Sequence, residues 1–246
     1  MARFFVRREN IQGTKAILDG QELEHLRRVL RLTAGDTVTL FDDAGWEHEA
    51  VISNLHSDRG ELDICRSYEA GRESPLALTL ALGLTKGEKM DFVVEKATEL
   101  GVATILPFAS SFTVPKLNDK KIADRSERWR KIALSAAKQC GRTQVPEILP
   151  LCEFGQMVQG ADSRRLKLLF WEKETTQSLR QVYDANADAP AILIVIGPEG
   201  GLSSAEAQLA LARDFHSVHL GRRILRAETA AIAALSLVQF LWGDLR

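Results

Sequence analysis

The sequence predicts a small β-barrel followed by an α/β domain with a mainly parallel sheet. Two observations support this fold class. Short strand-like segments separated by turn residues fill the first part of the chain, and strands alternate with helical patterns in the rest. The polar stretch at residues 68–75 reads as a linker between the two patterns. We therefore expect one domain at residues 1–72 and a second at residues 73–246.

The first domain is predicted to contain three strands and one helix. The strands are expected at residues 37–41, 49–52 and 61–65, with turn residues at 42–45 and 57–60 between them. A helical stretch at residues 21–32 interrupts them. One side of that helix is apolar, and its other side carries His25, Arg27, Arg28 and Arg31.

The second domain alternates strands and helices in order along the chain. Strands are expected at residues 76–82, 104–108, 167–171, 191–196 and 217–220, where Pro107 marks an early end of the second one. Helical patterns lie at residues 90–100, 129–140, 177–183, 203–214 and 229–241, and Gly101 stands where a helix would place its C-cap. This alternation predicts a parallel sheet.

Composition excludes several classes of protein. No apolar run approaches the ~20 residues that a membrane span needs, and the N-terminus lacks the apolar stretch of a secretion signal. Cys65, Cys140 and Cys152 are odd in number and never in Cys-x-x-Cys spacing. This pattern argues against disulfides and against a zinc site, so we expect no metal and a cytoplasmic location.

The net charge of −1 hides an uneven distribution. Residues 3–31 and 86–142 each carry more lysine and arginine than aspartate and glutamate. Such local excess permits a phosphate-binding surface, although ordinary solvated surfaces account for the same counts.

Two loops carry most of the functional information. Residues 197–201 read Gly-Pro-Glu-Gly-Gly, and residues 220–230 read Leu-Gly-Arg-Arg-Ile-Leu-Arg-Ala-Glu-Thr-Ala. Each follows a predicted buried strand and leads into a helical pattern. Loops that leave the carboxyl ends of adjacent parallel strands converge on one crevice, and glycines let their backbone approach a ligand closely. For the first loop, a tight structural turn is the alternative.

The residues around these loops refine the prediction. Ser203 and Glu206 have the spacing of a capping box, so a helix is expected to begin there, and Thr229 is a candidate cap of the last helix. Three arginines at positions 222, 223 and 226 indicate a negatively charged or strongly polar ligand. A surface charge run paired with Glu228 is the alternative.

These segments together carry a resemblance. Residues 196–201 and 220–230 resemble the signature of the ribosomal RNA small subunit methyltransferase E family, which belongs to the SPOUT class of S-adenosylmethionine-dependent RNA methyltransferases. Further matches follow in order along almost the whole chain, at His25 with residues 28–31, and at residues 87–90, 99–102, 139–142, 145–148 and 243–245. Residues 119–125 and 152–165 match no motif of the family.

The resemblance implies both a fold and an activity. Residues 1–72 would form a PUA-like β-barrel that helps to bind RNA, and residues 73–246 a SPOUT-like domain with a deep trefoil knot. The implied cofactor is S-adenosylmethionine, and the implied partners are small-subunit ribosomal RNA or a ribosomal particle and a second copy of the chain. The implied reaction methylates N3 of one uridine in 16S ribosomal RNA.

The resemblance also assigns candidate site residues. Backbone and apolar groups are expected to hold the cofactor, at Phe170, Glu172, Ile196, Gly197, Gly200, Gly201, Leu220, Gly221, Ile224, Leu225, Arg226 and Thr229. Uracil N3 carries a proton, so the site needs a base or a cation that stabilises the uracil anion. Arg226 is the candidate cation, and Glu199 or Glu228 the candidate base. A structural role for either carboxylate is the alternative.

RNA contacts are expected from basic residues in both domains. Arg7, Arg28 and Arg31 are candidates in the barrel, and Lys89 and Arg142 near the catalytic mouth. Three other functions stay open. The chain is alternatively a methyltransferase acting on a different RNA position, an RNA-binding ribosome assembly factor with a vestigial cofactor pocket, or a small-molecule enzyme with an anionic ligand. Cofactor binding separates the assembly factor from the methyltransferases, and a steep loss of RNA affinity with salt argues against the small-molecule enzyme.

Overall fold

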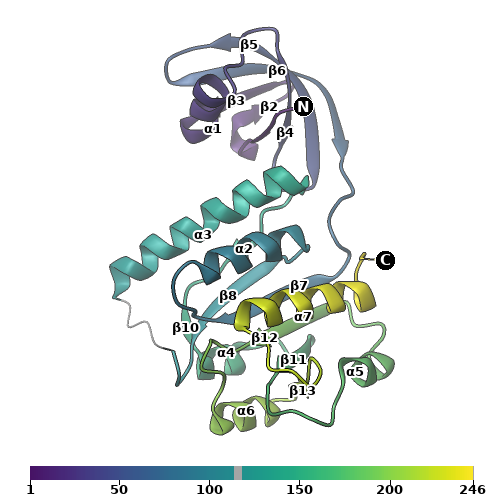
Figure 1. Ribbon diagram of the computed structural model, residues 1–246. Coiled ribbons are helices and arrows are strands. Elements are labelled where there is room, and N and C mark those ends of the chain that lie inside the picture. The colour runs from purple at the N-terminus through teal and green to yellow at the C-terminus, as the bar shows by residue number, and fades with distance from the viewer. Residues whose placement is uncertain (114–117, 246) are drawn as a thin grey trace. The chain divides into compact units, whose positions relative to one another are not determined.

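The computed structural model describes residues 1–113 and 118–245, and the chain divides into two compact units (Figure 1). The N-terminal unit combines Met1–Glu73 with Ala137–Val145, and the C-terminal unit combines Ser74–Ala136 with Pro146–Arg246. The segment Ala137–Val145 thus belongs to the N-terminal unit, although it lies far along the chain. The sequence predicts a single boundary between residues 72 and 73, which would place residues 137–145 in the second domain.

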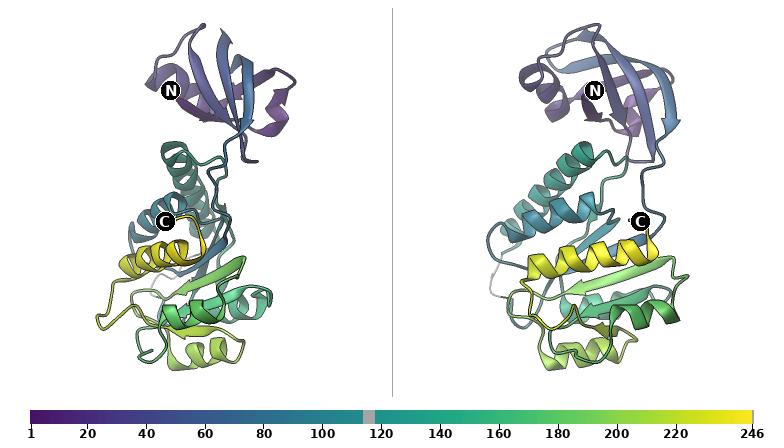
Figure 2. Two further views of the ribbon diagram at one scale, coloured as in Figure 1. Left: turned by 90° about the vertical axis from the view of Figure 1, so that its right-hand side faces the viewer. Right: turned by 45° about the vertical axis from the view of Figure 1, so that its right-hand side comes forward.

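The N-terminal unit is built on a curled six-stranded sheet in the order β1-β4-β5-β6-β3-β2 (Figure 2). Its strands are β1 (Arg3–Phe5), β2 (Ile11–Gln12), β3 (Lys15–Asp19), β4 (Thr37–Phe41), β5 (Trp46–Leu55) and β6 (Arg59–Glu69). β1 and β4 pair in parallel, and the other neighbours pair antiparallel. The three predicted strands are all present. β1 and β2 have only three and two residues and were not predicted. β3 was not predicted either, because its Ala-Ile-Leu run hides an alternation that appears only in its burial.

The predicted helix at residues 21–32 is shorter than expected. It consists of α1 (Gly20–Glu24) and a π-helical turn, η2 (His25–Val29), and a 3-10 turn, η1 (Arg8–Asn10), precedes it. Arg31 then takes a left-handed backbone conformation with φ 54°, which ends the helix. Leu26 is fully buried in the core of the sheet, whereas Val29 is 69% exposed.

Polar contacts anchor Ala137–Val145 in the N-terminal unit. The guanidinium of Arg142 pairs with the Glu73 carboxylate at 2.8 Å. The amide of Val145 donates to Asp43 Oδ1 at 2.6 Å, and Arg3 donates to the carbonyl of Arg142 at 3.2 Å. These contacts join positions distant in sequence, which explains why local patterns do not indicate them.

The C-terminal unit contains a seven-stranded sheet in the order β10-β8-β7-β12-β11-β13, with β9 paired to β8. Its strands are β7 (Ala77–Gly83), β8 (Thr104–Ala109), β9 (Glu147–Ile148), β10 (Cys152–Glu153), β11 (Leu166–Phe170), β12 (Ala191–Ile196) and β13 (His216–Val218). Every pairing is parallel, so the predicted mainly parallel α/β sheet is confirmed. β12 is nearly all apolar because it lies between β7 and β11 and is covered on both faces.

Helices cover both faces of this sheet. They are α2 (Lys89–Glu99), α3 (Asp119–Cys140), α4 (Phe154–Gly160), α5 (Leu179–Ala185), α6 (Ser204–Leu211) and α7 (Ala227–Trp242). α2 and α7 lie side by side on one face, and α4 and α6 lie on the other (Figures 1 and 2). None of the helices among the described residues is long and apolar enough to cross a membrane.

The local signals at helix and strand ends are partly confirmed. Ser203 and Glu206 form a capping box at the start of α6, and Gly101 follows α2 with φ +77°. Two expectations are wrong. Pro107 does not end its strand, because β8 continues to Ala109 and pairs Pro107 with Leu82. Thr229 does not cap the last helix, because α7 begins at Ala227. The trefoil knot stays a prediction.

Candidate active site

The carboxyl ends of three neighbouring parallel strands meet at one place. Phe170, the last residue of β11, aligns with Ile196 at the end of β12 and with Val218 at the end of β13. The segments that follow them, residues 171–174, 197–201 and 219–227, enclose one cavity of about 490 Å³. Lys89 and Ala230 complete its lining. A ligand site at the carboxyl edge is what the topology of such a sheet favours.

The loop at residues 197–201 is tightly packed. The Gly201 amide donates to the Pro198 carbonyl at 2.8 Å and closes a turn in which Gly201 has φ +72°. Pro198 lies directly against Gly83, the last residue of β7, where an added Cβ would overlap the proline ring and its backbone nitrogen. The loop therefore has its shape because residues 83, 197 and 201 carry no side chain.

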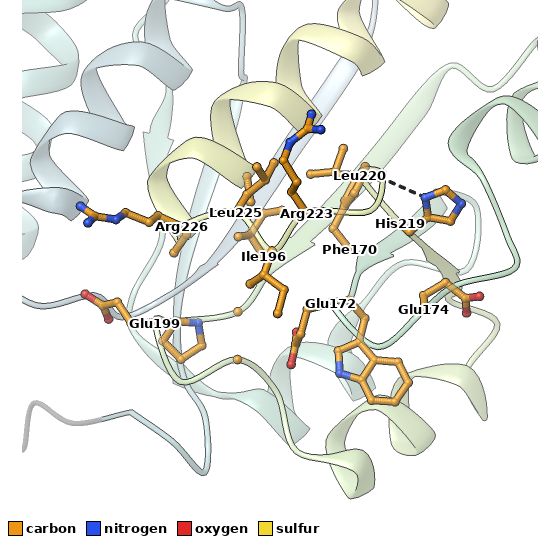
Figure 3. A pocket seen from close by; sticks show the side chains of 18 of the residues that line it. Phe170, Glu172, Glu174, Ile196, Glu199, His219, Leu220, Arg223, Leu225 and Arg226 are labelled. Atoms are coloured by element: carbon orange, nitrogen blue, oxygen red, sulfur yellow. Dashed lines mark hydrogen bonds between the residues drawn. The ribbon is translucent and has the colours of Figure 1, made fainter.

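The loop at residues 219–226 has much more space around it. Gly221 has φ +95° and no atom lies within 4 Å of where its Cβ would be. Its amide donates to Nδ1 of His219 at 3.1 Å (Figure 3). Ile224 is 83% exposed, although it lines the cavity. This wall presents backbone groups and exposed side chains to a ligand.

Glu174 fixes the third segment of the wall. The Thr176 hydroxyl and amide each donate to Glu174 Oε1 at 2.7 Å, and the Gln177 amide donates at 3.1 Å. The bonds from Thr176, its hydroxyl above all, lower the pKa of the Glu174 carboxyl to about 2. Nearby, the buried Nε1 of Trp171 has no hydrogen-bond partner among the described residues.

One end of the cavity is charged. Figure 3 shows Arg226 and Glu199 on the same side, with His219 and Glu174 on the other. Lys89 Nζ lies 3.1 Å from Glu199 Oε1 and 3.7 Å from Glu228 Oε2. Burial raises the pKa of the Glu199 carboxyl, but hydrogen bonds from the Lys86 amide, its own amide and Lys89 outweigh this and leave the pKa below its ordinary value.

Most of the predicted cofactor residues line this cavity. They are Phe170, Glu172, Ile196, Gly197, Gly200, Gly201, Leu220, Gly221, Ile224, Leu225 and Arg226. Thr229 does not, because it lies exposed in the first turns of α7. Glu199 also lines it, whereas Glu228 lies behind Lys89.

Arg222 and Arg223, which the sequence predicted to face a charged or polar ligand, also line the cavity. Several other lining residues were not among the predicted site residues: Trp171, Glu174, Pro198, Val218, His219, Ala227 and Ala230. Trp171, Glu174, Pro198 and Ala227 lie at or between a predicted strand end and the next predicted helix start. Val218 and His219 lie within the strand predicted at residues 217–220, and Ala230 lies in the predicted last helix. Extending the site to the last residues of each strand and the first turn of each helix would have found them.

The predicted RNA contacts separate into two groups. Arg7 and Arg28 have side chains 69% and 77% exposed, each with only a surface ion pair to a nearby glutamate, and Arg31 is exposed. Arg142 is different. Its side chain is 7% exposed and committed to Glu73, so it stabilises the N-terminal unit and does not face a phosphate. Residues 1–113 and 118–245 contain no group of three or more His, Cys, Asp or Glu that would hold a metal.

Comparison with known proteins decides the family. A family model described as RNA methyltransferase domain matches residues 72–239, and one described as RNA methyltransferase PUA domain matches residues 18–65. Ribosomal RNA small subunit methyltransferase E of Bacillus subtilis is 32% identical over 98% of this chain and 96% of its own. This chain belongs to the ribosomal RNA small subunit methyltransferase E family.

Two solved structures share the fold over almost the whole chain. A ribosomal RNA small subunit methyltransferase E from Neisseria gonorrhoeae, bound to S-adenosyl methionine, has a TM-score of 0.91 and 35% identity, with 100% of both chains covered. A Legionella pneumophila protein in complex with the bound cofactor SAM has a TM-score of 0.90 and 34% identity, with 99% of this chain and 98% of that chain covered.

The cavity of this family member fits such a cofactor. Its volume of about 490 Å³ lies within the range of ~300–1,000 Å³ found for cofactor sites. Ile196, Leu220 and Leu225 supply apolar surface, and the glycine loops supply backbone groups. The charged end adds polar anchors through Lys89, Glu199 and Arg226.

Proposed function

We propose that this protein transfers a methyl group from S-adenosylmethionine to N3 of a specific uridine in small-subunit (16S) ribosomal RNA. The observation that carries the proposal is the single cavity at the ends of β11, β12 and β13, with one charged end. The names of the relatives support a ribosomal RNA substrate, and the cofactor bound in two similar structures supports the methyl donor. The N3 position is the one that the sequence resemblance implies.

The protein's first task is to hold the cofactor. The loops at residues 197–201 and 219–226 surround the adenosyl group with backbone and with the side chains of Ile196 and Leu225. The bound cofactor supplies an electrophilic methyl group, so alignment with the attacking nitrogen is the main requirement. A tightly packed first loop suits this task because it fixes one wall in advance.

The second task concerns the proton on uracil N3. Loss of this proton leaves negative charge that spreads to O2 and O4, and the Arg226 guanidinium stabilises that charge. Glu199 lies on the same side of the cavity and accepts the proton (Figure 3). Glu228 has its Oε2 buried, so we assign it a supporting role.

The third task is RNA binding by the N-terminal unit. Arg7, Arg28 and Arg31 are exposed, and the surface ion pairs of Arg7 and Arg28 with glutamates are weak enough to exchange for phosphates. Replacement of Arg28 and Arg31 by Ala together should weaken RNA binding and flatten its dependence on salt. An unchanged salt slope would remove both from the interface.

A homodimer belongs to the same proposal. α7 and α2 expose large apolar side chains, with Leu237 at 43%, Phe240 at 60% and Phe92 at 46% exposure. Such a face favours contact with another protein surface, and a second copy is the partner that the family resemblance implies. Light scattering of the wild type and of Phe240→Glu tests it, with a monomeric variant expected. We place the protein in the cytoplasm, where a ribosomal substrate would meet it.

The experiment that tests the activity is methylation of ribosomal RNA in vitro. The purified protein and S-adenosylmethionine are incubated with free 16S RNA or with small subunits from cells that lack the gene. We expect 3-methyluridine by mass spectrometry and a reverse-transcription stop at a single uridine, because an N3 methyl blocks base pairing. Another methylated nucleoside would refute the N3 assignment. Cofactor binding without any transfer would favour an assembly factor.

A further inference from the structure

Lys89 links two carboxylates from different elements. It is the first residue of α2, whereas Glu199 comes from the loop after β12 and Glu228 from the first turn of α7. Its ammonium lies within ion-pair distance of both, at 3.1 Å from Glu199 and 3.7 Å from Glu228. Three segments distant in sequence therefore meet at one side chain at the charged end of the cavity.

The two carboxylates differ in what they face. Glu199 lines the cavity, and its Oε1 also accepts a hydrogen bond from the Lys86 amide at 3.1 Å. Glu228 has a side chain only 17% exposed, and its Oε2 has no hydrogen-bond partner among the described residues, so the Lys89 ammonium is its counter-charge. Without that ammonium, two partly buried carboxylates would share a site, and one would bind a proton at higher pH.

A purely structural role explains the position of Lys89 poorly. A cation in the first turn of a helix opposes the helix dipole and costs roughly 0.3–1 kcal/mol. The acidic groups on the side of α2 that meets α3 already have partners, since Arg128 pairs with Asp91 at 2.5 Å and with Glu88 at 3.9 Å. Lys89 is therefore directed to the cavity by its carboxylate partners.

We propose that Lys89 is a positioning residue for methyl transfer, which holds Glu199 ionised and aimed at the substrate while the buried Glu228 holds Lys89 from behind. The inference rests on the proposed function. In the reaction, the N3–H bond breaks and the proton passes to Glu199. The electron pair left on N3 forms the new N–C bond as the C–S bond breaks and its pair stays on sulfur. Arg226 lines the same end of the cavity and is a second cation on the side of Glu199 (Figure 3). The inference replaces the predicted phosphate contact of Lys89.

The test compares pH profiles of kcat for Lys89→Gln and for wild type. Loss of the ammonium should raise the pKa that governs the acid limb, moving that limb up by about one pH unit. Turnover on the acid side of the limb should therefore fall about tenfold relative to wild type, recover as the pH rises towards 7, and be restored in part by Lys89→Arg. Cofactor affinity should stay within about twofold, because the affected groups lie at the charged end.

A matched control lies on the same helix. Lys96 pairs with Glu95 and Glu99 outside the cavity, at 2.7 and 2.8 Å, so Lys96→Gln should keep the wild-type pH profile. Glu228→Gln is isosteric and should not move the acid limb upward, because Lys89 then faces Glu199 alone. Glu199→Gln should reduce turnover more than Glu228→Gln.

Three outcomes would overturn the inference. An unshifted profile for Lys89→Gln with weaker, less salt-dependent RNA binding would return Lys89 to a phosphate contact. An unshifted profile with lower thermal stability would make its role structural. A larger loss in Glu228→Gln than in Glu199→Gln would make the buried carboxylate the proton acceptor. Wild-type protein that transfers no methyl group would instead refute the proposed function.

Discussion

The two glycine loops that wall the cavity differ in how closely the protein surrounds them. At residues 197–201, Pro198 packs against Gly83 with no room for a methyl group. At residues 219–226, Gly221 has no neighbour within 4 Å of a Cβ position, and Ile224 is 83% exposed. The first loop is shaped by protein contacts before a ligand arrives, whereas the second has few. We infer that the first loop supplies a fixed shape that holds Glu199, and that the second supplies the cation Arg226.

The largest expected effect is on the second loop. Arg226→Ala should lower kcat by about 10²–10³-fold, the loss typical of removing one group that stabilises charge in the transition state. Cofactor affinity, measured by calorimetry, should change little. Arg226→Lys keeps the positive charge, so its kcat should lie between those of wild type and Arg226→Ala. An equal loss of affinity and turnover would mean that Arg226 only holds the cofactor.

The next effect is on the first loop. Gly83→Ala should displace Pro198, because the added Cβ would overlap the proline ring and its backbone nitrogen. Neither group can rotate away as a flexible side chain would. Such overpacking costs about 1–3 kcal/mol, so cofactor affinity should fall about tenfold. Calorimetry measures the loss of cofactor affinity, and thermal unfolding measures the loss of stability. Wild-type affinity in this variant would show that the first loop is not fixed by its contacts.

A smaller effect is expected for the matched change in the open loop. Gly221→Ala introduces a side chain at φ +95° without a clash. The cost is backbone strain of about 1 kcal/mol, which corresponds to about fivefold in affinity. The same titration compares this variant with Gly83→Ala. A greater loss here than at Gly83 would reverse the distinction between the two loops.

The smallest effect on activity at neutral pH is expected for Glu174, in the wall segment that follows β11. The Glu174 pKa is about 2 in the folded protein against 4.5 for the free group, so its ionised form stabilises the fold above pH 4.5. That contribution is lost as the pH falls from 4.5 through 2. Glu174→Gln should therefore lower the unfolding temperature at pH 7 by at most ~2–4 °C.

The pH dependence provides the check on this last variant. Unfolding temperatures of wild type and Glu174→Gln should converge as the pH is lowered from 4.5 towards 2, because the wild-type carboxyl then becomes neutral as well. A difference that stays constant over this range would mean that the charge of Glu174 does not stabilise the segment.

The strand ends of the C-terminal unit could be predicted because their signals are local. β12 was predicted with its observed bounds, since six consecutive apolar residues end at a glycine loop. The same reasoning brought most of the cofactor residues together, because strand order in a parallel sheet places their ends at one edge. Local capping at Ser203 was equally clear.

Other features depend on contacts between distant residues. Arg142 resembled an exposed cation in the sequence, and only its pairing with Glu73 shows that it is buried. The ion pairs of Lys89 join three separate elements, so no local pattern could have indicated them. β10 and α4 lie within residues 152–165, which matched no motif of the family.

The membership of Ala137–Val145 in the N-terminal unit has a consequence for how such proteins can be cut and recombined. The chain passes between the units at residues 73, 136 and 145. A truncation after residue 73 would leave Glu73 without Arg142 and Asp43 without the amide of Val145. Gene fusion or shuffling therefore cannot transfer the N-terminal unit as one contiguous segment. Residues 1–73 expressed alone would need residues 137–145 as a separate peptide to restore these contacts.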